Sequence, residues 1–245
     1  METEAQLLTL WKEVFGEYEG FWEMFLKTGY SSDRCRCTLE EDTVTAALCW
    51  FDCFCDGQKF AYLYAVVTHP EHRGRGLCRS LMADTHIHLK KLGYAGVLLV
   101  PAEEGLRGMY RKMGYSDATY VAEFSCTAGE EAAPLRTVSP EEYAALRRRM
   151  LPDGGVIQEG ENLTFLAAQA ELMAGNGILL AAWREEDTLH CMELLGDKEA
   201  APGIVKALGC EKGNFRTPGE DKPFAMGLKL QEDAVLPNYF AFAFD

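Results

Sequence analysis

Residues 64–81 combine residue types that could hold a phosphorylated ligand. An apolar strand sequence stops at His69-Pro70, two glycines separated by one arginine follow at 74–76, and an amphipathic helix pattern then begins. Glycine permits left-handed backbone conformations and a close approach of ligand to backbone, while the first turn of a helix presents free N–H groups to an anion. This order predicts a nest of backbone N–H groups suited to a pyrophosphate, with arginines beside it.

The glycine pattern differs from two common nucleotide-binding loops. A P-loop requires GxxxxGK[ST], which the chain lacks, and a dinucleotide-binding fingerprint requires a third glycine that residues 74–79 do not contain. The observed pattern is Arg-x-x-Gly-x-small, from Arg73 through Gly76 to Cys78. For this segment taken alone, an ordinary glycine-rich turn between a strand and a helix remains the alternative.

Together with a second segment, this loop resembles the signatures of the GCN5-related N-acetyltransferase (GNAT) superfamily. The first matching stretch runs from Val66 to Leu77, and the second, residues 105–115, contains a tyrosine followed by Gly114-Tyr115. The resemblance covers about residues 1–125 and implies an acetyltransferase with acetyl-CoA as cosubstrate. The second half of the chain is similar, more weakly, to the degenerate C-terminal half of tandem bacterial members.

The resemblance implies roles for particular residues. The backbone of residues 66–68 would pair with the pantetheine arm like an added strand, and backbone N–H groups of residues 74–79 would hold the pyrophosphate. Tyr110 would protonate the departing thiolate as a catalytic acid, while a core aromatic on a short helix is the simpler interpretation of this tyrosine. The expected cofactor-binding residues are Val66, Val67, Thr68, Arg73, Gly74, Arg75, Gly76, Leu77, Cys78 and Arg79.

Two residues depart from the family pattern, and the sequence does not identify a general base. Cys78 stands where the family has glycine or alanine, and Glu103 stands seven residues before Tyr110, where the family often has asparagine. The strand at 60–68 contains no carboxylate. The candidates for the base are Glu19, Glu23, His69 and the terminal carboxylate at Asp245, although carboxylates on a helix usually form its solvated face.

Around these segments the sequence predicts a succession of helices and strands. Two short aromatic helices within 4–29 precede strands at 34–39, 44–55 and 60–68, and a helix at 77–92, a strand at 95–100, a short helix at 105–112 and a strand at 120–125 follow. The second half has predicted helices at 141–149, 163–174 and 200–208 and predicted strands at 177–183, 188–195, 224–230 and 239–244.

The expected fold class is α+β, with a mixed, mostly antiparallel central sheet flanked by helices, as in the GNAT fold. We expect a catalytic domain at 1–127, a linker at 128–133 and a degenerate GNAT-like domain at 134–245. Each half places two strands before a short helix that ends in glycine, at Gly114 and at Gly209. The second half has no counterpart of the Arg-Gly-Arg-Gly segment and is therefore expected to lack a coenzyme A loop.

Composition argues against several classes of protein. The net charge of −14 disfavours nucleic acid as a partner. The chain has no apolar run long enough to span a membrane, and its acidic N-terminus is unlike a signal peptide, so we expect a cytoplasmic protein. Nine cysteines without a CxxC pair predict buried free thiols, not a disulfide framework or a metal site.

We therefore expect an acetyl-CoA-dependent N-acyltransferase that moves an acetyl group to a primary amine of a small molecule or peptide by direct attack in a ternary complex. Two alternatives remain open: a non-catalytic acyl-CoA-binding or regulatory module, and a structural protein whose loop binds nothing. The acidic charge mildly favours a cationic acceptor. The sequence is compatible with a homodimer and does not identify the acceptor.

Overall fold

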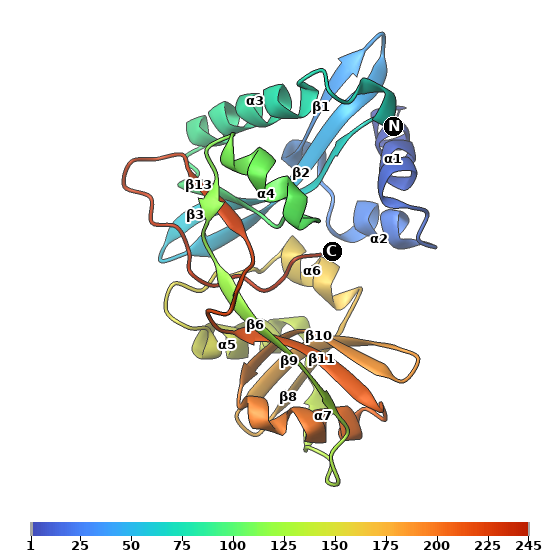
Figure 1. Ribbon diagram of the computed structural model, residues 1–245, viewed down its shortest axis with the longest axis vertical. Helices are drawn as coiled ribbons and strands as arrows, with labels where there is room; N and C mark the ends of the chain where they lie inside the picture. The colour runs from blue at the N-terminus through green and yellow to red at the C-terminus, as the bar shows by residue number, and fades with distance from the viewer. Residues whose placement is uncertain (1, 245) are drawn as a thin grey trace. The chain divides into compact units, whose positions relative to one another are not determined.

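The computed structural model describes residues 2–244, which form two compact units (Figure 1). Unit 1 comprises the chain up to Ser116 together with Gly227–Leu236, and unit 2 comprises Asp117–Met226 together with the chain from Pro237 onward. Each unit contains one sheet with helices packed on it. The expected fold class, α+β with mostly antiparallel sheets, is therefore confirmed. The expected domain limits, 1–127 and 134–245, stay a prediction.

Unit 1 is built on a six-stranded sheet in the order β1-β2-β3-β4-β13-β5. Its strands are β1 (Cys35–Glu40), β2 (Thr43–Cys55), β3 (Gln58–Thr68), β4 (Gly96–Leu99), β5 (Ser116–Asp117) and β13 (Met226–Lys229). Its helices are α1 (Glu2–Phe15), α2 (Phe21–Thr28), α3 (Leu77–Lys91) and α4 (Glu104–Arg111), with 3-10 turns η1 (Ser32–Arg34) and η2 (Pro70–His72). The elements predicted around the loop are confirmed, with small shifts at their ends.

A β-bulge in the β2–β3 pair lies near the end of β3, beyond the part of β3 that pairs with β4. The antiparallel register of β2 and β3 shifts between Ala47 and Cys49, opposite Ala65, whose φ of 50° is unusual for a residue other than glycine. The parallel pairing of β3 with β4 covers only Phe60–Tyr62 against Gly96–Leu98. Within the described residues, the last part of β3 therefore has no β4 partner and leaves backbone groups available beside the loop.

The aromatic residues predicted for the first helices form much of the core of unit 1. Trp11, Trp22 and Phe25 are each at most 3% exposed, and they pack on the sheet through Tyr64, whose ring centroid lies 5.1 Å from that of Phe25. Trp11 and Phe25 meet edge to face at 5.3 Å. Burial of this size favours a core role for these side chains, and Tyr18, which is 64% exposed, lies outside that core.

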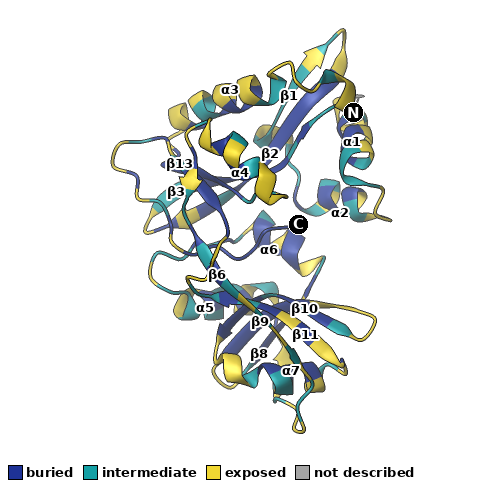
Figure 2. Ribbon diagram, viewed as in Figure 1, coloured by how far each residue is buried: buried dark blue, intermediate teal, exposed yellow. Residues whose placement is uncertain are grey.

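Helix α3 follows from the spacing of its apolar residues. Leu81, Met82, Thr85 and Leu89 are buried and recur at three- to four-residue intervals, while the opposite side of the helix is exposed (Figure 2). The helix ends as the sequence predicts, because Gly93 adopts a φ of 83° and the Tyr94 N–H donates to the Leu89 carbonyl.

Unit 2 is built on a seven-stranded sheet in the order β12-β6-β11-β10-β9-β8-β7. Its strands are β6 (Tyr120–Thr127), β7 (Leu135–Thr137), β8 (Glu171–Gly175), β9 (Ile178–Glu185), β10 (Thr188–Gly196), β11 (Lys212–Pro218) and β12 (Lys222–Pro223). Its helices are α5 (Pro140–Met150), α6 (Glu161–Ala167) and α7 (Ala201–Ala207), with a 3-10 turn η3 (Lys198–Ala200).

Unit 2 repeats part of the arrangement of unit 1. An antiparallel pair, β9 and β10, has a register shift at Met192, and a crossover through α7 leads to β11, which is parallel to β10. This is the order of β2, β3, α3 and β4 in unit 1. The segment before α7 reads Gly-Asp-Lys-Glu-Ala-Ala-Pro from residue 196, with two acidic residues and a proline that has no N–H. It has none of the features expected of a pyrophosphate loop.

In the second half, several elements differ between the sequence-based prediction and the structure. The helix predicted for 163–174 ends at Ala167, and Glu171–Gly175 is instead strand β8, which pairs with β7 and β9. Strand β11 was not predicted. The strand predicted for 239–244 is absent from the described residues. The segment contacts the rest of unit 2 through one bridge between Gly155 and Tyr239, through hydrogen bonds from the Gln158 and Arg216 side chains to its carbonyls, and through its buried side chains.

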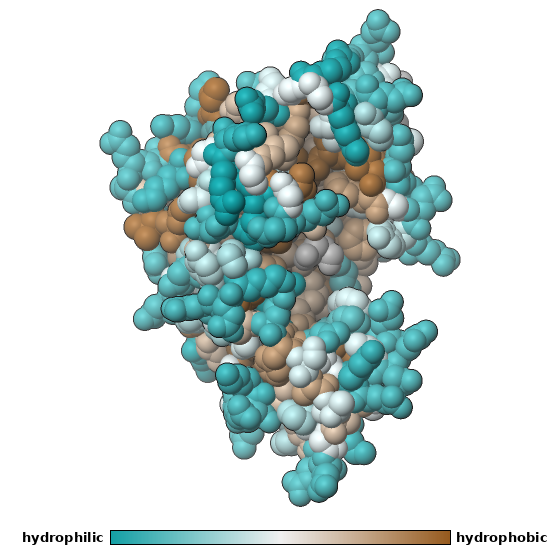
Figure 3. All heavy atoms as spheres, in the orientation of Figure 1, coloured by the Kyte–Doolittle hydropathy of each residue, from teal (hydrophilic) through white to brown (hydrophobic). Residues whose placement is uncertain are grey.

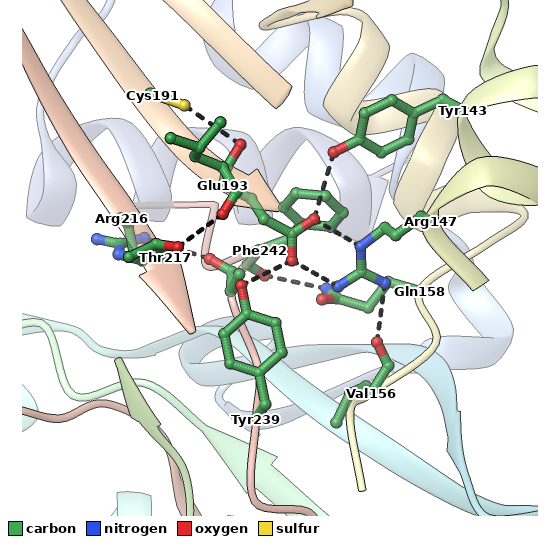
Figure 4. Close-up of polar contacts among 12 residues, drawn as sticks. Tyr143, Arg147, Val156, Gln158, Cys191, Glu193, Arg216, Thr217, Tyr239 and Phe242 are labelled. Atoms are coloured by element: carbon green, nitrogen blue, oxygen red, sulfur yellow. Dashed lines mark hydrogen bonds and ion pairs between the residues drawn. The ribbon is translucent and has the colours of Figure 1, made fainter. Parts of the chain in front are cut away.

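A buried ion pair holds this last segment in unit 2 (Figure 4). Arg147 on α5 donates from Nε and Nη2 to the two carboxylate oxygens of Glu193 on β10, at 2.7 and 3.0 Å. The hydroxyls of Tyr143 and Tyr239 donate to the same carboxylate at 3.3 and 2.9 Å. The Arg147 guanidinium also lies 4.4 Å from the ring centroid of Phe242. The cluster therefore pairs the buried Glu193 carboxylate with a cation and fixes residues 239–242 in unit 2.

The surface is dominated by polar side chains. On the face shown in Figure 3, hydrophilic residues cover most of the outer atoms. Of the helices formed by residues 2–244, none combines the length and the apolar character needed to cross a membrane.

Candidate cofactor and acyl-transfer site

The two glycines of the loop adopt backbone conformations that other residues avoid. Gly74 and Gly76 have φ angles of 77° and 83°, and a Cβ added to either would meet no atom within 4 Å. Their conformation is therefore required by the turn itself, not by packing. Gly76 is the N-cap of α3, a 15-residue helix, and provides no side-chain cap, so the first-turn N–H groups receive no hydrogen bond from a cap side chain.

The arginines of the loop differ in their partners. Arg75 forms a bidentate pair with Glu40 on β1, at 2.9 and 2.8 Å, and Glu40 also lies 3.2 Å from His72 Nδ1. The hydrogen bond from Arg75 lowers the pKa of the Glu40 carboxyl. Arg73 donates from Nε to the Thr68 carbonyl, and Arg79 is exposed. Arg75 therefore fixes the loop to β1, and much of its charge is neutralised by Glu40.

The end of β3 lies directly before this loop and has groups that could pair with a ligand. Val67 is buried, whereas Val66 and Thr68 are half-buried. Thr68 Oγ1 is a buried oxygen with no hydrogen-bond partner among the described residues. A buried polar atom of this kind is costly unless water or a ligand completes it. With the open space at the glycines, this unpartnered oxygen leaves room and a polar atom for a ligand beside the loop.

Tyr110 lies on α4 and is 6% exposed. Burial, followed by the nearby Cys78 thiol, raises the pKa of its hydroxyl to about 12, so the hydroxyl keeps its proton at neutral pH. Its ring packs edge to face on Tyr115 at 5.8 Å. A protonated phenol held in this way can act as a proton donor to a leaving group.

A hydrogen bond to the half-buried His86 fixes Tyr115, the residue on which Tyr110 packs. The Tyr115 hydroxyl lies 2.8 Å from His86 Nε2 on α3, and the Tyr115 N–H donates to the Tyr110 carbonyl at 3.1 Å. Burial lowers the pKa of His86 to about 4, so its ring is neutral at neutral pH and Nε2 can accept the tyrosine proton. The family signatures did not point to His86, because helix and strand spacing cannot reveal which residue of α3 meets Tyr115.

Cys78 does not have the surroundings of a nucleophile. It is half-buried at the start of α3, and its Sγ lies 3.8 Å from Met82 Sδ. Burial raises its pKa, which keeps the thiol protonated. Its small side chain leaves the loop geometry intact, in agreement with its place in the Arg-x-x-Gly-x-small pattern.

The structure places the expected base candidates but assigns none of them. Glu23 pairs with Lys12 at 2.5 Å, and this hydrogen bond lowers the pKa of its carboxyl. Glu19 is exposed, and His69 lies 3.5 Å from Glu13 while its Nδ1 accepts from the Glu71 N–H. Asp245 lies outside the described residues. Glu103 is exposed at the N-cap of α4.

Comparison with known proteins identifies relatives of this arrangement. The protein-family model described as an acetyltransferase (GNAT) domain matches residues 2–118. A GCN5-related N-acetyltransferase from Anabaena variabilis is 17% identical, with a TM-score of 0.72 over 94% of this chain and 71% of that one. One from Kribbella flavida is 16% identical, with a TM-score of 0.69 over 96% and 71%. No match to a curated protein was found.

A third structure resembles the chain over almost its whole length. A tandem GNAT protein from the clavulanic acid biosynthesis pathway is 12% identical, with a TM-score of 0.55 over 95% of each chain. At these identities the likeness concerns the fold. It agrees with two GNAT-like halves and with the repeated order of β2, β3, α3 and β4 in β9, β10, α7 and β11.

Proposed function

Because residues 2–118 form a GNAT acetyltransferase domain, of a family that uses acetyl-CoA as cosubstrate, we propose that this protein transfers an acetyl group from acetyl-CoA to a primary amine of a small molecule or peptide. The observation that supports this most directly is the loop at 73–79, where two left-handed glycines and an uncapped helix N-terminus face open space. Such a nest suits the pyrophosphate of coenzyme A.

The proposed binding mode uses the backbone more than the side chains. N–H groups at Gly74, Gly76 and the first turn of α3 hold the pyrophosphate, while exposed Arg73 and Arg79 contribute positive potential. Backbone groups of Val66–Thr68 pair with the pantetheine amides as an added strand. The Thr68 hydroxyl gains a hydrogen-bond partner from the ligand.

The proposed chemistry is a direct transfer in a ternary complex. The amine nitrogen attacks the thioester carbonyl carbon, the carbonyl π electrons move to oxygen, and backbone N–H groups of β3 stabilise the oxyanion. When the tetrahedral intermediate collapses, the C–S bond breaks and Tyr110 gives its proton to the departing thiolate. The amide and the free thiol of coenzyme A are the products. The amine nitrogen loses one proton to solvent, and one proton from solvent returns to the Tyr110 oxygen, so the overall proton count balances.

Calorimetry and a thiol-release assay test this function in two steps. Titration of the full chain with acetyl-CoA should give saturable heat, and an amine panel that includes polyamines and peptide amines should release coenzyme A thiol from acetyl-CoA. The absence of heat at high micromolar acetyl-CoA would exclude both catalysis and binding. Saturable heat without thiol release for any amine would favour the alternative, a non-catalytic acyl-CoA-binding module.

Other expectations stay predictions. They are the cytoplasmic location, a homodimer, the lack of nucleic-acid and membrane partners, and the degenerate role of the second half. The second half has no counterpart of the Arg-Gly-Arg-Gly segment before α7, which supports a single coenzyme A site in the chain, at residues 73–79.

A further inference from the structure

Three thiols gather on two neighbouring strands, far along the chain from the Tyr110 segment. Cys35 and Cys37 lie on β1, two residues apart and therefore on one face, and Cys49 lies on β2. Cys35 and Cys49 are direct partners in the antiparallel register. The mechanism proposed above uses none of these side chains.

The register gives Cys35 and Cys49 the spacing that a disulfide requires. Directly opposite residues of an antiparallel pair have Cα atoms about 4.5 or 5.5 Å apart, and disulfides span Cα distances of about 4.4–6.8 Å. Burial and, after it, the neighbouring Cys35 thiol raise the pKa of Cys49, as expected for side chains on the same face of directly paired residues.

The other nearby thiols have spacings less suitable for a disulfide. Cys35 and Cys37 are separated by two residues along one strand, which is about 6.7 Å and at the upper limit for a disulfide. Cys53 lies four residues beyond Cys49 on β2, or about 13 Å away. Within the described residues, no group of three or more histidine, cysteine or acidic side chains could hold a metal ion, so a metal site does not account for the cluster.

The difference in solvent exposure between the two cysteines predicts which one reacts first with an oxidant. Cys35 is half-buried and Cys49 is 3% exposed, so a reagent from solution meets Cys35 first. Burial raises the pKa of Cys49 well above its usual value, and the charge of Arg34 offsets part of that increase.

We propose that Cys35 and Cys49 are a reversible disulfide-forming pair that is oxidised by a low-molecular-weight disulfide. The Cys35 thiolate attacks one sulfur of that disulfide, which forms a mixed disulfide and releases one thiol. The Cys49 thiolate then attacks Cys35 Sγ, which forms the protein disulfide and releases the second thiol. The two cysteines are oxidised by two electrons, the reagent is reduced to two thiols, and the two protons lost by the cysteines end on those thiols.

Glutathione disulfide is the probe for this test, applied to the folded full chain. After alkylation of free thiols, trypsin and chymotrypsin can separate the three cysteines, because Arg36 lies between Cys35 and Cys37 and Leu48 precedes Cys49. We expect a Cys35–Cys49 linked peptide, an intact mass lower by about 2 Da, and full reversal by dithiothreitol. This result does not depend on an acceptor amine or on acetyl-CoA binding, so it stands or falls independently of the proposed function.

Two variants sharpen the assignment. Cys49→Ser should stop the reaction at a glutathione adduct on Cys35, whereas the matched control Cys37→Ser should still form the linked peptide. A stable glutathione adduct on Cys35 in the unmodified chain, a Cys35–Cys37 linkage, or unreacted thiols at both positions would each overturn the proposal. Because peptide mapping of the unmodified chain decides between these outcomes, a variant that folds poorly leaves the test intact.

Discussion

At Tyr110, burial determines which chemistry the side chain can do. The side chain is 6% exposed and its pKa is raised to about 12, so the phenol remains a proton donor throughout the physiological pH range. The same burial places its ring against Tyr115, which is held in turn by His86. The proposed acid is thus fixed by packing, and burial is the main cause of its raised pKa.

Removal of the Tyr110 hydroxyl tests the acid role. Tyr110→Phe should lower kcat of acetyl-CoA thiol release by about 10²-fold or more, the usual contribution of a general acid, and should leave the acetyl-CoA dissociation constant nearly unchanged. Tyr18→Phe, at a tyrosine that is 64% exposed, is the control and should behave like the unmodified chain. If turnover of Tyr110→Phe is unaffected, the acid role is wrong.

His86 predicts a pH dependence of stability. Its pKa falls from 6.5 to about 4 on folding because burial disfavours the charged ring. Above pH 6.5 the ring is neutral in both states and burial carries no charge penalty. As the pH falls from 6.5 through 4, the unfolded state gains a proton that the folded state does not, so the free energy of unfolding decreases by up to about 3 kcal/mol.

A denaturant titration at several pH values measures this effect. His86→Gln keeps a hydrogen-bond acceptor for Tyr115 but does not titrate, so its free energy of unfolding should fall less steeply than that of the unmodified chain between pH 6.5 and 4. Carboxylates titrate in both proteins and cancel in the difference. Coincident pH profiles would show that His86 has no shifted pKa in the folded chain.

Part of the site could be predicted at the residue scale. The glycines and Tyr110 were identifiable because they stand in short, continuous motifs. The Glu40–Arg75 pair and the His86–Tyr115 pair were not, because each joins residues about 30 positions apart, 35 in one case and 29 in the other. Such contacts depend on how the loop lies against β1 and how α3 lies against the segment that follows α4, and the sequence motifs carry no information about that packing.

At the scale of elements, a glycine substitution in the loop between β3 and α3 tests whether this loop binds acetyl-CoA. Gly74→Ala introduces a Cβ at a φ of 77°, which strains the backbone by about 1 kcal/mol and places a methyl group where the phosphates are expected. Calorimetry should show at least a tenfold weaker affinity for acetyl-CoA.

The chain offers a matched control for this substitution. Gly57, in the turn between β2 and β3, has the same φ of 77° and also has no atom within 4 Å of an added Cβ. Gly57→Ala should therefore lower stability as much as Gly74→Ala while leaving acetyl-CoA affinity unchanged. Equal affinities for the two variants would contradict a phosphate-binding role for the loop.

The elements of unit 1 were more predictable than those of unit 2. Strands β2 and β3 and helix α3 have clear apolar patterns; β2 and α3 are followed by glycine turns, and β3 is followed by His69-Pro70. The β8 sequence, Glu-Leu-Met-Ala-Gly, consists largely of good helix formers, and pairing with β7 and β9 overrides that local preference. Strand β11 has only Gly213, Phe215 and Thr217 pointing inward, a pattern too weak to stand out in a polar segment.

At the scale of the whole molecule, the stability of unit 2 depends on a buried charge pair. Glu193 and Arg147 are 0% and 3% exposed and are joined by two hydrogen bonds. Glu193→Gln leaves the Arg147 charge buried without a counter-ion and should lower the free energy of unfolding by about 3–5 kcal/mol.

The control for this prediction is an exposed pair of the same type. Glu171 accepts from Arg184 at 2.9 Å, and both side chains are about half exposed. Glu171→Gln should change the free energy of unfolding by less than about 1 kcal/mol. Chemical denaturation measures both variants, and similar losses for the two would show that burial of the Glu193 pair adds nothing.

The path of the chain between the units has a consequence for synthesis on the ribosome. Residues 227–236 leave unit 2, provide most of β13 between β4 and β5, and the chain then returns to unit 2 at Pro237. The Leu230 N–H donates to the Ala95 carbonyl in that position. An N-terminal domain usually folds while later residues are still being made. Here the first sheet must wait for a strand translated more than 100 residues after β5, so β4 emerges with an unpaired edge that nascent-chain chaperones would have to shield.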